Sequence, residues 1–105
     1  CRREITAGDD QLAAMGLGRD EVSFGVYVPV GCERCDGAGY AGRTGLFAAV
    51  EPTKAMRLAV RADGGAEVLR QALGDDAWKR LARAAVEKLR AGITSPQEVA
   101  EALRA

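Results

Sequence analysis

One stretch decides the fold of this chain: residues 31–45, which read Gly31-Cys32-Glu33-Arg34-Cys35-Asp36-Gly37-Ala38-Gly39-Tyr40-Ala41-Gly42-Arg43-Thr44-Gly45. It contains two of the three cysteines, at CxxC spacing, and five of the 13 glycines. A CxxC turn lets two thiolates face one centre, which is half of a tetrahedral zinc site. The glycines that follow suit a tight loop that needs positive φ angles. The stretch therefore predicts a compact metal-binding turn between two strands.

The segments on either side of this turn have strand character. Glu21–Val30 has apolar residues at positions 22, 24, 26, 28 and 30, and this period of two is typical of a half-buried strand. Pro29 removes a backbone donor, so the strand ends there or lies at an edge. Thr44–Val50 is mostly apolar and predicts a second strand. We expect the two strands to pair as an antiparallel ribbon around the turn, with Tyr40 and Phe47 packed over it.

Helical patterns dominate the rest of the chain. They predict a short helix over residues 10–15, then helices over 53–61, 66–73 and 76–91, and a last helix that starts at the capping box Ser95-Pro96-Gln97-Glu98. The helix over 76–91 carries an apolar stripe that begins at Trp78, which we expect in the core. The turn Asp63-Gly64-Gly65 is the expected hinge between the ribbon half and the helical half.

These elements predict an α+β fold. We expect a small antiparallel β-ribbon with a CxxC knuckle, followed by a mostly helical C-terminal bundle. The corresponding domains are a metal-binding β-ribbon subdomain over residues 1–51 and a helical subdomain over residues 52–105.

Composition narrows the functional classes. The apolar fraction of 48% argues against disorder, and 15 basic against 15 acidic residues give no bias toward nucleic acid or an anionic membrane surface. No apolar run is long enough for a membrane span, and there is no signal-peptide pattern. The chain lacks histidine, which excludes imidazole ligands and histidine-dependent triads, and it lacks a GxxxxGK[ST] phosphate loop. It begins with Cys rather than Met, so we expect a piece of a longer protein.

Cys1, Cys32 and Cys35 are the candidate metal ligands. An odd number of cysteines does not suit a disulfide framework, whereas thiolate–metal bonds in a reducing compartment do suit it. Two alternatives stay open. The first is a redox dithiol, but a CxxC of that kind normally begins a helix after a strand, whereas glycines follow here. The second is a set of inert buried thiols, which are common in proteins. Zinc is the expected metal, although its site is incomplete in this chain; Glu4, Asp36, water or a neighbouring chain are possible sources of the fourth ligand.

Two resemblances follow from these motifs. Cys32-x-x-Cys35-Asp36-Gly37-Ala38-Gly39 resembles one repeat of the cysteine-rich zinc module of DnaJ-type co-chaperones, which needs several repeats. The longer run from Gly31 through Gly39-Tyr40-Ala41-Gly42-Arg43-Thr44-Gly45-Leu46-Phe47 resembles the signature of the type II secretion and type IV pilus assembly ATPases, the general secretory pathway protein E family. Gly92-Ile93-Thr94-Ser95-Pro96-Gln97-Glu98-Val99 is similar to that family's closing GITSxEEV segment, so the resemblance covers the whole chain in order.

The second resemblance implies a tetracysteine metal site, in which Cys32 and Cys35 join an earlier cysteine pair roughly thirty residues upstream. Cys1 precedes Cys32 by 31 positions and would match the second cysteine of that pair, with its partner before the start of the chain. If Cys1 matches the first cysteine instead, Glu4 stands where the second should be, and the site would have three thiolates and one carboxylate. Arg43 would lie at a hexamer or nucleotide-domain interface; the alternative is a surface arginine paired with a carboxylate. Ala48 departs from the family's glutamate, and Ala84-Ala85 from its Asp-Gly pair.

The resemblance also implies a parent protein and its setting. The parent would be a cytoplasmic hexameric ATPase, peripheral to the bacterial inner membrane, that docks on the platform proteins of the secretion or pilus machine. ATP and Mg would bind to the parent outside this chain, which would itself have no catalytic residue. The chain would then be the C-terminal region of that ATPase, an accessory module with a structural and protein-interaction role. A DnaJ-like zinc module and a metal-free helical interaction domain are the alternatives.

Overall fold

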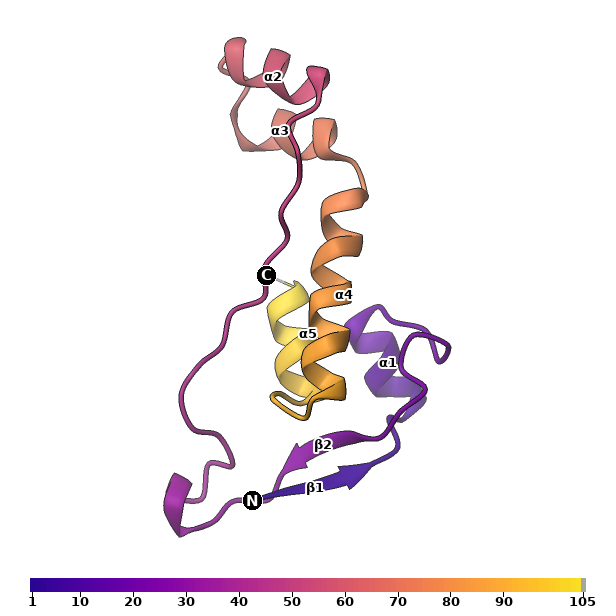
Figure 1. Ribbon diagram of the computed structural model, residues 1–105, viewed down its shortest axis with the longest axis vertical. Coiled ribbons are helices and arrows are strands. Elements are labelled where there is room, and N and C mark those ends of the chain that lie inside the picture. The colour runs from indigo at the N-terminus through magenta and orange to yellow at the C-terminus, as the bar shows by residue number, and fades with distance from the viewer. Residues whose placement is uncertain (105) are drawn as a thin grey trace.

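The computed structural model describes residues 1–104 as an elongated α+β structure with principal extents of 52 × 30 × 19 Å. Its elements follow in the order β1 (Arg2–Ile5), α1 (Asp9–Met15), β2 (Val26–Pro29), the 3-10 turn η1 (Glu33–Cys35), α2 (Lys54–Arg61), α3 (Gly65–Leu73), α4 (Asp76–Arg90) and α5 (Pro96–Arg104). Figure 1 shows the β-ribbon at one end of the long axis and the α2–α3 pair at the other. The predicted α+β class is confirmed.

The two strands form a ribbon, but its pairing differs from the prediction. β1 pairs antiparallel with β2, in the register Arg2↔Pro29 to Ile5↔Val26. Residues 44–50 are extended but unpaired, so the strand predicted there, and its pairing with Glu21–Val30, were wrong. The missed partner is the charged segment Arg2–Ile5, which has no strand-like composition of its own and depends on its neighbour for order.

One cation–π contact and one hydrogen bond hold the ribbon to the helical part, and a second cation–π contact lies within the ribbon. The Arg2 guanidinium lies 4.2 Å from the Tyr27 ring centroid, and its Nη1 donates to the carbonyl of Gly92 at the end of α4. Arg90 lies 4.8 Å from the ring centroid of Phe24, just before β2. The ribbon is therefore positioned by the turn between α4 and α5.

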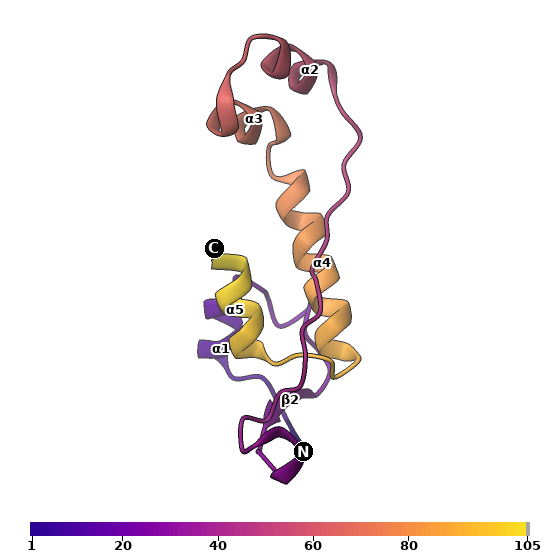
Figure 2. The same cartoon turned by 90° about the vertical axis from the view of Figure 1, so that its left-hand side faces the viewer.

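The main core lies where α1, α4 and α5 meet, above the ribbon in the view of Figure 2. Its buried side chains are Ala7, Leu12, Met15, Leu17, Val22, Val26, Ala82, Ala85, Leu89, Val99 and Ala100. Both sides of the domain boundary predicted after residue 51 contribute to this list, so the two segments share one core. The division into two subdomains itself stays a prediction.

The glycine and capping residues in the sequence predicted the ends of several helices correctly. Gly16 ends α1 at φ 71°, and the N–H groups of residues 16 and 17 donate back to the carbonyls of Ala13 and Leu12. Gly92 follows α4 in the same way, with φ 69°. Ser95 caps α5, where its Oγ accepts from the Glu98 N–H at 3.4 Å.

Three further expectations were wrong. Phe47 does not pack over the cysteine turn, because it is 81% exposed. Trp78 is 42% exposed and lies against Gly16 at the edge of the core. The turn at Asp63–Gly65 joins α2 to α3, which pack on each other, so it does not separate the ribbon half from the helical half.

Candidate metal centre

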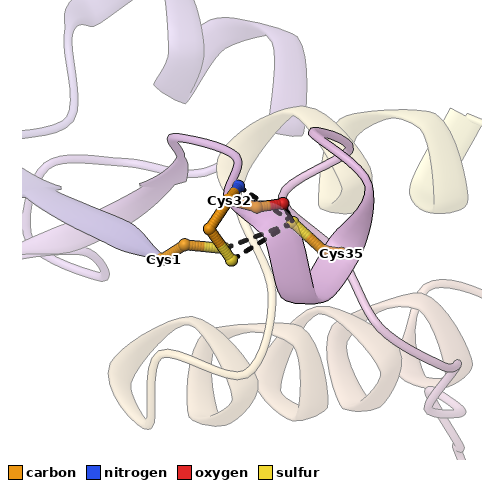
Figure 3. A group of neighbouring side chains, drawn as sticks. All are labelled: Cys1, Cys32 and Cys35. Carbon is orange, nitrogen blue, oxygen red and sulfur yellow. Dashed lines mark hydrogen bonds between the residues drawn. The ribbon is translucent and has the colours of Figure 1, made fainter.

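The ribbon brings the three cysteines together at its open end. Cys1 directly precedes β1, and its carbonyl accepts from the N–H of Val30 just after β2. Cys32 is the N-cap of the η1 turn that follows, and Cys35 is the last residue of that turn. The three Sγ atoms lie within 4.8 Å of one another, with Cys35 3.4 Å from Cys1 and 3.6 Å from Cys32 (Figure 3).

The backbone after Cys32 folds beneath the sulfur atoms. The carbonyl of Cys32 accepts from the N–H groups of Cys35 and Gly37, at 3.3 and 2.9 Å. Asp36 then adopts the left-handed conformation with φ 53°, and Gly39 has φ 83°. A Cβ atom at Gly39 would overlap Pro29, so only glycine brings this N–H to the cysteine cluster.

Cys35 is the centre of the cluster electrostatically as well as geometrically. Its Sγ accepts from the N–H of Gly39 at 3.1 Å and from that of Cys32 at 3.2 Å. The Gly39 N–H has the largest effect and the Cys32 N–H the next largest, and they lower the pKa of the Cys35 thiol from 9.0 to about 7. Partial burial of the thiol has a smaller, opposite effect and raises this pKa. A thiolate is the form that binds metal, so this turn favours a metal ligand at neutral pH.

This shift predicts the pH dependence of Cys35 reactivity in the metal-free chain. The lowered pKa means that the thiolate dominates above about pH 7, so alkylation of Cys35 by iodoacetamide should reach half its maximal rate near that pH. Urea removes the two N–H donors, and the midpoint should then rise toward 9.0. Peptide mapping by mass spectrometry measures both midpoints. A midpoint near 9.0 in the folded chain would show that the turn does not stabilise the thiolate.

The structure gives three thiolate ligands and narrows the choice of the fourth. Among residues 1–104, the cysteine cluster includes no carboxylate. Glu4 is paired across the ribbon with Tyr27, whose hydroxyl lies 3.5 Å from its Oε2, and it is not part of the cluster. Asp36 lies next to Cys35 in sequence but is not part of the cluster either. Three thiolates that converge on one point fit a tetrahedral zinc ion with one position left for another group. Metal binding itself stays a prediction.

Arg43 lies on a different part of the surface. It lines an open cleft of about 660 Å³ together with Tyr40, Thr44, Thr94 and Glu98. The carboxylate pairing considered as its alternative role is not observed, since Arg43 takes part in no salt bridge within the described part of the chain. The interface role of Arg43 stays a prediction.

A hydrogen bond that the sequence did not reveal joins the two sides of this cleft. The hydroxyl groups of Tyr40 and Ser95 lie 2.5 Å apart, although 55 positions separate the residues. Ser95 is buried, and it also caps α5. The glycine-rich loop after Cys35 is thereby fixed to the start of α5. The sequence indicated this contact only through the presence of both family motifs, the glycine-rich loop and the segment before α5, in one chain.

Comparison with known proteins points to secretion machinery. A family model described as type II/IV secretion system protein matches residues 3–101. The chain is 29% identical over 100 residues to the type IV pilus assembly ATPase PilB of Pseudomonas aeruginosa, covering 94% of the chain and 18% of that protein. It is 35% identical over 106 residues to the type II secretion system protein E of Aeromonas hydrophila, covering 99% of the chain and 20% of that protein.

The chain thus spans about a fifth of the length of these relatives. No solved structure matches it significantly. Within residues 1–104, no helix has both the length and the apolar character needed to cross a bilayer.

Proposed function

The chain belongs to the type II/IV secretion system protein family, and from this premise we propose that it is an accessory module of a secretion or pilus assembly ATPase, with a structural and protein-interaction role. One observation carries the proposal. The two segments that resemble the family most closely, 39–45 and 92–99, meet at the Tyr40–Ser95 hydrogen bond and form a cleft with Arg43 at its surface. An open cleft formed by these two segments suits contact with another protein surface.

Zinc is part of this proposal. Cys1, Cys32 and Cys35 hold a structural zinc ion, and the fourth ligand comes from outside the chain, most simply from another cysteine of the parent protein. The ion would fix the open end of the ribbon to the η1 turn, where residues 30–39 contribute little to the main core. Its role is to order this end of the module, and no chemistry is assigned to it.

Nucleotide chemistry belongs to the rest of the parent. The chain has no GxxxxGK[ST] sequence to cradle phosphates, so ATP and Mg bind elsewhere. The parent would assemble as a homo-hexamer in the cytoplasm, peripheral to the inner membrane, and contact the platform proteins of its machine. A homo-hexamer repeats each surface six times, so an exposed arginine such as Arg43 would meet the same neighbouring surface at every interface.

The metal-free helical interaction domain is the remaining alternative. It is favoured by the position of the main core, which includes none of the three cysteines. The DnaJ-like alternative has less support, because the family model that matches describes secretion proteins and the chain has a single CxxCxGxG repeat.

The function is tested in the full-length ATPase in its native bacterium. Deletion of this segment should abolish secretion or pilus assembly. Arg43→Ala should reduce the same output several-fold without changing zinc content or melting temperature, because Arg43 makes no salt bridge within the described chain. Arg3→Ala, at another exposed arginine, is the matched control. Intact secretion and pilus assembly after the deletion would overturn the proposal, and ATP hydrolysis by the isolated chain would overturn its non-catalytic part.

A further inference from the structure

The extended segment Gly45–Val50 has the features of a β-strand that lacks its sheet. It runs beside α4 from the cysteine end of the molecule toward α2 (Figures 1 and 2). Within residues 1–104, the backbone of residues 40–52 makes no hydrogen bond to another backbone group. A row of unpaired N–H and C=O groups in extended conformation is a template for pairing with another strand.

The segment is held in position rather than free. Leu46 packs against the main core, and the Ala49 carbonyl accepts from Arg80 Nη1 at 3.1 Å. Arg80 is itself fixed by Asp76, with Nε 2.9 Å from Oδ2. Because the strand is already ordered at two points, pairing would cost little further conformational entropy.

The side chains indicate which kind of sheet would fit. Residues 45–50 read Gly-Leu-Phe-Ala-Ala-Val, a continuous apolar run with no charged residue. Leu46 is covered by the core, while Phe47 is 81% exposed. A strand with one solvent-exposed face would alternate apolar and polar residues. Strands that are buried on both faces are continuously apolar, as in the sheets of α/β domains. Exposed sheet edges in native proteins usually carry charges that block pairing, and this edge carries none.

We propose that Gly45–Val50 docks as an additional strand on an open sheet edge of the nucleotide-binding domain of the parent ATPase, with Phe47 buried against that domain. This inference rests on the proposed function, which places a nucleotide-binding domain in the parent. Phosphate-binding loops are built between a strand and a helix, so that domain contains an α/β sheet of the type the segment suits. The PilB and protein E relatives are about five times the length of this chain, which leaves ample polypeptide for the domain.

Hydrogen exchange with mass spectrometry tests the docking in the full-length ATPase and in the 105-residue chain. In the chain alone, the amides of residues 46–50 should exchange nearly as fast as unstructured amides. In the full-length protein they should be protected at least about 100-fold, as sheet amides are. Phe47→Asp should remove this protection, together with that of one edge strand in the nucleotide-binding domain, and Phe47→Leu should retain both. The melting temperature of the isolated chain should hardly change with either variant, because Phe47 is exposed there.

Rapid exchange of these amides in the full-length protein would overturn the inference. So would protection in the isolated chain that is independent of concentration. Protection that disappears on dilution would mean that copies of the chain pair with each other, and it would overturn the inference as well. The function test is independent. If the deletion leaves secretion and pilus assembly intact while the amides are protected, the proposed role fails and the docking stands. If the amides exchange rapidly and the deletion strain is defective, the docking fails and the proposed role stands.

Discussion

Replacing Cys35 with serine is expected to weaken the proposed zinc binding of this chain by about 100-fold. The Cys35 sulfur is the central atom of the cluster, 3.4 Å from that of Cys1 and 3.6 Å from that of Cys32, and it receives the two backbone N–H groups. Structural zinc sites contribute roughly 10–16 kcal/mol of apparent binding free energy. If four ligands share that value, the loss of one costs about 3 kcal/mol, which is about a 100-fold loss of affinity.

Competition with a chromophoric chelator measures this loss. Asp36→Asn is the matched control, because Asp36 is the neighbouring residue in the same turn but is not part of the cluster. We expect the control to bind zinc as the unmodified chain does. Equal zinc affinity of the Cys35→Ser variant and the unmodified chain would exclude Cys35 as a ligand.

The second large effect is expected in the core that both halves of the chain share. Leu89→Ala removes a fully buried side chain of α4, and such changes cost roughly 2–5 kcal/mol through lost burial and the remaining cavity. Native domains have only about 5–15 kcal/mol of stability in total. At roughly 4–8 °C per kcal/mol for a chain of this size, the melting temperature should fall by about 10 °C or more.

Leu58→Ala is the matched control for this prediction. It deletes the same atoms from α2, where the leucine is 54% exposed, so its cost should stay below about 1 kcal/mol. Thermal melts followed by circular dichroism compare the two variants. Similar melting temperatures for the two variants would mean that the buried side chain of α4 does not contribute to the stability of the core.

The helices could be predicted closely because their signals are local. Gly16, Gly92 and the Ser95-Pro96 pair mark helix ends through backbone geometry that depends on few neighbours. Strand pairing could not be predicted, because it depends on a partner far away in the sequence. Arg2–Ile5 is a strand through its pairing with β2, whereas residues 44–50 have strand composition but no strand partner among the described residues 1–104.

The sequence predicted which residues would cluster at the candidate site, but it did not predict the acidity of their thiols. The CxxC spacing and the third cysteine predicted that three sulfur atoms would meet, and they lie within 4.8 Å. The lowered pKa of Cys35 depends on the direction of the Gly39 and Cys32 N–H groups, which only the folded turn reveals. The same holds for the position of Glu4 outside the cluster, because the β1–β2 register that pairs it with Tyr27 had not been predicted.

The zinc content of the unmodified chain is the most direct test of the central claim, that the cysteine cluster is a structural metal site of a secretion ATPase module. Elemental analysis of the purified chain is combined with thermal melts before and after chelation. We predict about one zinc ion per chain and a clear fall in melting temperature after its removal. No bound zinc and an unchanged melt would contradict the claim, and would mean that the strands and helices hold the fold without metal.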